Sequence, residues 1–283
     1  MLRILIFIVA ALFPLYAQAQ AQINTKKIKI ADFPTKITKI VLTGNDFYDL
    51  ALRDEIASRW RLSPYEFCTL EEFNVIKNSE DYYFLITADS RFKTETENGI
   101  TFLTLVKGGK GADKGIGKML EVVSLPICSS EDPSGREFTF MPAFVDIIQD
   151  YTTAAMERDI YGYAGLRSNT ENLRMAADME LIFAEDDLSA GVDRAFRAAN
   201  FDSDISVADE DTTDKKMEES TPDTIISYVV TASDPANGTY CFKMLIHPES
   251  HKLYYFRKHR ISSKYGPGFL QEDILRINAQ RGR

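Results

Sequence analysis

KIVLTGNDF at residues 39–47 decides the fold, because MELIFAEDDL at residues 179–188 repeats its pattern. Each stretch is a short apolar run that leads into polar residues and then another apolar side chain. Three further similarities follow in the same order: Asn98-Gly99 with Asn237-Gly238, Cys128-Ser129-Ser130 with Ile261-Ser262-Ser263, and Pro142-Ala143-Phe144 with Pro267-Gly268-Phe269. Similarities that recur in one order indicate an internal duplication, and loops absorb the differences in spacing.

Short apolar and aromatic runs in both copies predict the strands. They are Lys39–Leu42, Tyr65–Cys68, Tyr82–Thr87, Ile100–Val106 and Leu120–Leu125 in the first copy, and Met179–Phe183, Ile225–Thr231, Tyr240–Ile246 and Leu253–Ile261 in the second. Leu52, Ile56 and Trp60 recur at fourfold spacing, which predicts a helix with these side chains in the core. A capping box of Thr69 and Glu72 predicts the start of the next helix, with Leu70, Phe73 and Ile76 facing inward.

The order of these elements predicts an α+β fold made of two tandem copies of a βαβαβββα unit. Strands joined by a helix tend to be parallel, and strands joined by an Asn-Gly turn antiparallel. Each copy should therefore be a mixed sheet with helices on one face, a two-layer sandwich. The chain then divides into a signal peptide (1–21), an N-terminal extension (22–37), a first α/β repeat (38–156), a linker (157–178) and a second α/β repeat (179–283).

The N-terminus has the three parts of a secretory signal peptide. Arg3 supplies the positive charge, residues 4–15 form an apolar run, and Ala19 or Ala21 completes a small-x-small cleavage site. Because the apolar run is shorter than the roughly 20 residues that span a bilayer, we expect cleavage rather than anchoring. The sequence predicts an exported protein, periplasmic or secreted, with no membrane-spanning segment after signal cleavage.

The element order resembles that of the N-terminal domain of TolB and of the related envelope domains of CsgG and LpoB. The alternating Ala and Gln at the end of the signal peptide resemble exported proteins of Bacteroidetes. The resemblance implies a role in the cell envelope. It assigns no functional residue to this chain.

Composition restricts the class of partner. The chain has 42 acidic and 33 basic residues, with a formal net charge of −9. A negatively charged protein repels phosphate backbones, so we predict no nucleic-acid partner. An envelope protein or a small ligand is the predicted partner.

The polar residues that follow the first strand of each copy are the candidate binding residues: Asn45 and Asp46, with Asp186 and Asp187 in the equivalent place. Carboxylates at such a junction can bind a cation or act as acid and base. Acids at a helix start also cap the helix and interact well with its dipole, so capping, with Asp46 as the cap of the first helix, is the simpler explanation.

KGGKGADKGIGK at residues 107–118 has the composition of a phosphate-binding loop. The true motif, GxxxxGK[ST], stands between a strand and a helix. Here Gly117-Lys118 is followed by Met119, Ala112 replaces the first glycine, and a strand is predicted next. We therefore expect a long flexible hairpin loop whose lysines can contact an anionic partner.

No metal site, cofactor or catalytic residue is predicted. His247 and His251, with Glu249 between them, have metal-ligand spacing, but Pro248 places them in a turn, where solvated side chains are the simpler explanation. The acids between residues 202 and 214 lack the glycine and closing glutamate of a calcium loop and are expected on a solvated helix face. Cysteines 68, 128 and 241 leave two interpretations open: a Cys68–Cys128 disulfide, or small buried hydrophobic side chains.

The sequence thus favours an exported, non-enzymatic binding or scaffold protein of the cell envelope, with a ligand or partner in a groove between the two copies. Two alternatives stay open: an envelope hydrolase with an unrecognised site, and a small-ligand or ion-binding protein that uses the acidic loops.

Overall fold

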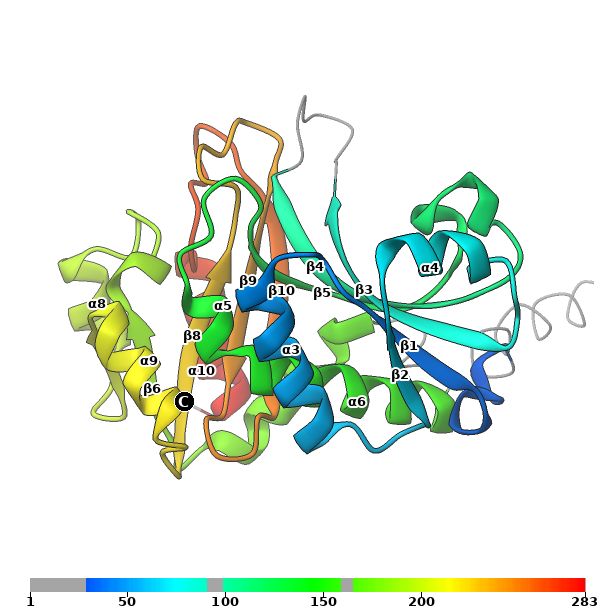
Figure 1. Cartoon of the computed structure of the whole chain (residues 1–283). Coiled ribbons are helices and arrows are strands. Elements are labelled where there is room, and N and C mark those ends of the chain that lie inside the picture. Colours follow the sequence, from blue (N-terminus) through cyan, green and yellow to red (C-terminus); the bar gives the residue numbers. More distant parts are fainter. Residues whose placement is uncertain (1–28, 91–98, 159–164, 283) are drawn as a thin grey trace, which may run out of the picture.

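The computed structural model describes residues 29–90, 99–158 and 165–282 (Figure 1). The predicted signal peptide at 1–21, residues 22–28 of the extension and Asn98 of the first Asn-Gly pair lie outside these ranges.

The first unit is a mixed five-stranded sheet with strand order β2-β1-β3-β4-β5. Its strands are β1 (Ile37–Val41), β2 (Tyr65–Cys68), β3 (Tyr82–Ser90), β4 (Ile100–Lys107) and β5 (Leu120–Ser129). Its helices are α3 (Asp46–Arg59), α4 (Leu70–Ile76), α5 (Arg136–Thr139) and α6 (Met141–Glu157), with short 3-10 helices η1 (Phe33–Thr35), η2 (Ala112–Lys114) and η3 (Ile116–Lys118). β1 pairs in parallel with β2 and β3, whereas β3, β4 and β5 pair antiparallel.

The second unit repeats this topology, with strand order β7-β6-β8-β9-β10. Its strands are β6 (Glu180–Ala184), β7 (Ile205–Ala208), β8 (Thr224–Val230), β9 (Tyr240–Ile246) and β10 (Leu253–Arg260). Its helices are α8 (Arg194–Asn200), α9 (Glu210–Glu218) and α10 (Gln271–Arg281), with 3-10 helices η4 (Gly165–Ala176) and η5 (Glu185–Asp187). The parallel and antiparallel pairs match those of the first unit strand by strand, which confirms two tandem α+β units.

The expectation that the helices cover only one face of each sheet is wrong. In the second unit, Met217 of α9 packs in the cluster shared with the first unit, whereas Ile277 of α10 packs in the cluster on the opposite face. The first unit also has helices on both faces. Ile40 of β1 packs in the cluster that contains α3 and α6, whereas its neighbour Val41 packs with Phe73 of α4 on the other face. Successive side chains of a strand point to opposite faces, so α4 must cover the second face. Leu70, predicted to face inward beside Phe73, is instead 48% exposed.

Helix α6 lies between the two sheets and is buried around most of its circumference. Its buried residues are Met141, Ala143, Phe144, Val145, Ile147, Ile148, Gln149, Tyr151, Thr152 and Ala155. It contacts α3 and β5 of its own unit, and Phe144 meets Tyr228 of β8 with ring centroids 5.4 Å apart. One hydrophobic cluster therefore runs from the first sheet through α6 to the second sheet.

Two direct contacts between the sheets reinforce this shared core. Phe102 of β4 and Phe242 of β9 form an edge-to-face pair with centroids 5.5 Å apart. The hydroxyl of Tyr228 donates a hydrogen bond to the backbone oxygen of Ile127 in β5, at 2.5 Å. Instead of the open groove expected between the copies, the junction is largely filled.

Part of the segment predicted as a linker is packed. η4 lies against β10 and α10, and its Leu173 and Ala176 are fully buried in a second cluster on the outer face of the second sheet. α8 and α10 cover the same face through Phe196 and Ile277.

The three cysteines are free thiols. Cys68 on β2 and Cys128 on β5 stand at opposite edges of a five-stranded sheet, about 19 Å apart at about 4.8 Å per strand, which is too far for a disulfide. Burial raises the pKa of Cys68 to about 11 and that of Cys128 to about 12. Of the two interpretations, the structure supports small, largely buried side chains.

The shared core predicts that both units unfold together. Met244 of β9 is fully buried against the first unit, so Met244→Ala should destabilise the chain by about 2–5 kcal/mol. Urea unfolding followed by the fluorescence of Trp60, the single tryptophan, and by far-UV circular dichroism should give one midpoint, lowered equally in both signals. Val75→Ala, at an 80% exposed position, is the control and should change stability by less than about 0.5 kcal/mol. A Trp60 midpoint that stays fixed in Met244→Ala would show independent units.

Candidate functional site

Asn45 and Asp46 form the N-terminus of helix α3. Asn45 is the N-cap, and its side-chain oxygen accepts hydrogen bonds from the backbone N–H groups of Phe47 and Tyr48, at 3.1 and 3.2 Å. The expected cap, Asp46, is therefore wrong by one position; it is the first helical residue, where the helix dipole favours an acid. The capping explanation holds for this pair.

Asp186 and Asp187 do not begin a helix. They belong to the 3-10 turn η5, and α8 starts later with Asp193 as its N-cap. Asp186 is exposed, whereas Asp187 is 3% exposed. No hydrogen bond or ion pair of the described residues joins Asn45 or Asp46 to either aspartate.

Asp187 instead belongs to a buried ionic cluster between the two units. Arg136 of α5 reaches into the second unit, where its Nη1 lies 3.4 Å from Asp187 and its Nε lies 2.8 Å from Asp214 and 3.1 Å from Glu210. Ser227 donates a further hydrogen bond to Asp187 at 2.5 Å. Two members of the acidic run expected on a solvated helix face therefore neutralise a buried cation.

The protonation of this cluster follows from burial and from Arg136. Burial raises the pKa of Asp187, Asp214 and Glu210, and the positive charge of Arg136 opposes that rise at each of them. Burial by itself lowers the pKa of Arg136, but the charges of Asp187 and Asp214 outweigh it and the arginine stays charged. The cluster holds the units together, and sequence reasoning missed Arg136 because its partners lie far away along the chain.

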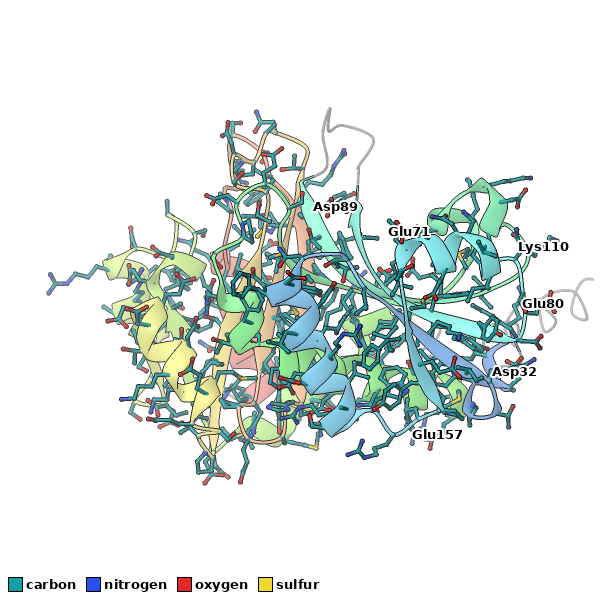
Figure 2. The ribbon with its side chains drawn as sticks, viewed as in Figure 1. Asp32, Glu71, Glu80, Asp89, Lys110 and Glu157 are labelled. Carbon is teal, nitrogen blue, oxygen red and sulfur yellow. The ribbon has the colours of Figure 1, made fainter. Side chains whose placement is uncertain are left out.

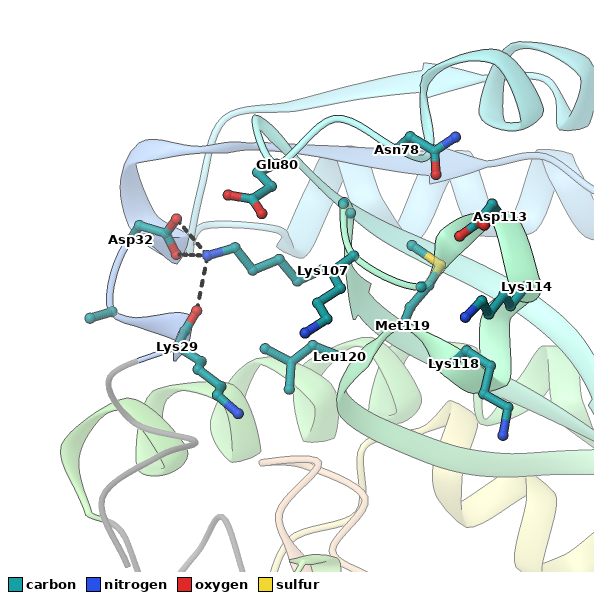
Figure 3. A pocket seen from close by; sticks show the side chains of 15 residues that line it. Lys29, Asp32, Asn78, Glu80, Lys107, Asp113, Lys114, Lys118, Met119 and Leu120 are labelled. Atoms are coloured by element: carbon teal, nitrogen blue, oxygen red, sulfur yellow. Dashed lines mark hydrogen bonds and ion pairs between the residues drawn. The ribbon is translucent and has the colours of Figure 1, made fainter. Parts of the chain in front are cut away.

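The lysine-rich loop between β4 and β5 lines a hollow of about 1350 Å³ at one end of the first unit (Figure 3). Its wall consists of Lys29, Ala31, Asp32, Asn78, Glu80, Lys107, Gly108, Gly109, Lys110, Gly111, Asp113, Lys114, Lys118, Met119 and Leu120. Asp32, Glu80 and Lys110 come from three separate segments and lie at the same end of the molecule (Figure 2). We call this cavity the basic hollow.

Backbone hydrogen bonds hold the start of this loop, which the sequence predicts to be flexible. The N–H groups of Gly108 and Gly109 donate to the backbone oxygens of Tyr82 and Lys77, both at 2.9 Å. A Cβ atom at position 108 would lie 2.2 Å from the backbone oxygen of Ser79, so glycine is required there. Two 3-10 turns, η2 and η3, then lead into strand β5 rather than a helix, which confirms that the loop is not a nucleotide-binding P-loop.

The basic hollow carries a positive charge that its own acids do not neutralise. Lys107 is held by Asp32 at 2.7 Å and donates to the backbone oxygen of Lys29 at 3.0 Å. Burial raises the pKa of Asp32, but hydrogen bonds from Lys107 and Tyr83 outweigh it and leave the pKa below its usual value. The remaining charged groups of the wall are four lysines and two acids, Lys29, Lys110, Lys114, Lys118, Glu80 and Asp113. The described residues provide none of these four lysines with an ion-pair partner.

A second cavity, of about 430 Å³, lies where the two units meet. It is lined by Arg59, Phe138, Thr139, Pro142, Met217, Glu218, Ser220 and His251. His251 Nδ1 lies 2.7 Å from Asp146 Oδ2, which Arg59 also contacts at 3.0 Å. We call it the junction cavity.

The junction cavity shows what the histidines of the turn do. His247 Nδ1 accepts a hydrogen bond from the backbone N–H of Ser250 at 3.1 Å, and His251 turns toward Asp146, so the two do not converge on a common ligand. Within the described ranges, no group of three or more His, Cys, Asp or Glu side chains is arranged to hold a metal ion. Ser220 lines the same cavity as His251, and no hydrogen bond joins them in the described structure.

Comparison of the chain with protein-family models, with curated proteins and with solved structures found no match. The functional argument therefore starts from the geometry of the two cavities.

The ionic cluster predicts that replacing the buried Arg136 lowers stability far more than replacing an exposed arginine. Arg136→Met leaves Asp187 buried without its cation and should cost about 3–5 kcal/mol of unfolding free energy in urea titrations. Arg197→Met, which removes the exposed pair with Glu185, should cost less than about 1 kcal/mol and serves as the control. Adding Asp187→Asn to Arg136→Met should restore part of the loss, since it removes the unpaired charge. Equal stability of the Arg136→Met protein and the wild type would contradict the assignment.

Proposed function

We propose that this chain is an exported binding protein of the cell envelope that binds a multiply charged anionic ligand in the basic hollow. The observation that carries the proposal is the convergence of lysines from a loop and from the start of the described chain around one cavity. The wall holds five lysines against three acids, an excess of two positive charges in a chain of net charge −9.

Physical chemistry supports an anion rather than another ligand class. Ammonium groups that lack carboxylate partners interact favourably with phosphate, sulfate or carboxylate oxygens. The hollow exceeds the roughly 300–1000 Å³ of typical small-molecule pockets, which favours an extended ligand over a single small ion. Asn78 and the backbone beside the loop glycines add neutral polar groups to the same wall.

The location is part of the proposal. The sequence pattern of residues 1–21 supports export, to the periplasm or beyond. No helix in the described part of the chain has both the length and the apolar character required to cross a bilayer. A protein exported into the envelope meets anionic glycans and phosphate-bearing polymers, and both present the chemistry that the lysines recognise.

Charge reversal in the basic hollow tests this function. Lys110→Glu combined with Lys114→Glu should weaken the binding of tripolyphosphate at low salt by at least about tenfold, because two attractive charges become repulsive. Lys215→Glu combined with Lys216→Glu, on α9 of the second unit, makes the same change in net charge and should leave the affinity nearly unchanged. Isothermal titration calorimetry at 20 and 150 mM salt measures both, with weaker wild-type binding expected at the higher salt.

A second titration with oligogalacturonate identifies the kind of anion. Tighter binding of tripolyphosphate would indicate a phosphate polymer, and tighter binding of the uronate would indicate an acidic glycan. Equal losses in the two double variants would mean that only overall charge matters, and the basic hollow would not be the site.

A further inference from the structure

The junction cavity exists only because the two units pack together. Arg59 at the end of α3 and Phe138 of α5 come from the first unit, whereas Glu218 at the end of α9 and His251 in the β9–β10 turn come from the second. Its volume of about 430 Å³ falls within the range of small-molecule pockets.

The contact with Asp146 shows which ring nitrogen of His251 donates a hydrogen bond. A carboxylate only accepts, so His251 Nδ1, at 2.7 Å from Asp146 Oδ2, must carry the hydrogen. Arg59 Nη1 lies 3.3 Å from the same Nδ1 because both nitrogens donate to Asp146 Oδ2. In the neutral ring, Nε2 is left as a hydrogen-bond acceptor.

His251 stands at a strained position of the turn. His251 has a φ of +54°, in the left-handed region that costs most residues about 1 kcal/mol and favours glycine. The turn would be less strained with glycine. The imidazole of His251 makes the hydrogen bond to Asp146 and lines the cavity, which glycine could not do.

Arg59 contributes little net positive charge to the junction cavity. Its guanidinium contacts Asp146 at 3.0 Å and Glu55 at 2.5 Å, so two carboxylates balance one cation. Glu218 has no cation within ion-pair distance in the described structure, and its one hydrogen bond, from the hydroxyl of Thr139, is long at 3.4 Å. Glu218 is therefore the charged group of the wall that no ion pair neutralises in the described structure.

The rest of the wall is apolar. Pro142 and the buried Met217 line it, and the ring of Phe138 is 40% exposed. An exposed aromatic ring attracts a cation through its negatively charged face and also packs well against an apolar group.

From these features we infer that the junction cavity is a second binding site, for a small organic amine with an apolar body. The ammonium group pairs with the carboxylate of Glu218 and donates to Nε2 of His251. The apolar body packs on Phe138, Pro142 and Met217. This ligand is opposite in charge to that of the basic hollow, so the two sites are independent.

Phenethylamine and its neutral analogue 2-phenylethanol test the site in the full-length mature protein. Isothermal titration calorimetry and saturation-transfer NMR should show binding of the amine and at least about tenfold weaker binding of the alcohol, because only the amine carries the charge. Glu218→Gln should weaken amine binding at least about tenfold. Glu219→Gln removes the neighbouring acid, which pairs with Lys215, and is the matched control with unchanged affinity.

Three results would overturn the inference. They are equal affinities for amine and alcohol, equal losses in the Glu218→Gln and Glu219→Gln proteins, and no binding of phenethylamine or butylamine to the wild type at 10 mM. Because Glu218 is exposed, Glu218→Gln should keep the wild-type melting temperature, and a circular dichroism melt verifies that the loss is local.

Discussion

The burial of α6 between two sheets is the constraint on which the structure depends. Phe144 and Ile148 are fully buried, and Phe144 packs against Tyr228 of the second unit. A helix that buries most of its circumference must be covered on both sides, so neither unit completes its core alone. The two units therefore share one hydrophobic core, and every feature at the junction, from the Arg136 cluster to the small cavity, depends on that packing.

Because the two units share one topology, equivalent loops in them can be compared directly. The hairpin between β4 and β5 in the first unit corresponds to the one between β9 and β10 in the second. In the first unit it is long and forms the wall of the basic hollow with Lys110 and Lys114. In the second it is a tight turn that carries His251 across to Asp146 of α6. The same position in the repeat thus supplies two cavities of different chemistry.

Features that depend on residues close in sequence could be predicted, whereas those that depend on tertiary contacts could not. The capping box of Thr69 and Glu72 forms as predicted, because its partners lie three residues apart. Leu52, Ile56 and Trp60 are buried as their spacing predicts. Asp187 was a candidate binding residue with helix capping as the simpler explanation, but it caps no helix and pairs with Arg136, which reaches it only after the units pack. The lysine loop was identified, but Lys29 and Glu80 join it through tertiary structure that no spacing shows.

A buried ion pair between β9 and α10 favours the observed position of α10 on its sheet. Lys243 of β9 and Asp273 of α10 are each 1% exposed and form an ion pair. Tyr255 donates to the same carboxylate at 2.6 Å, and the backbone N–H of Leu270 donates at 2.9 Å, so the oxygens of Asp273 are satisfied. A shift of α10 by one turn would leave both charges buried without partners, at a cost of about 3–5 kcal/mol. An apolar pair would carry no such penalty, so this ionic group favours the observed position of α10 against the sheet that carries the junction.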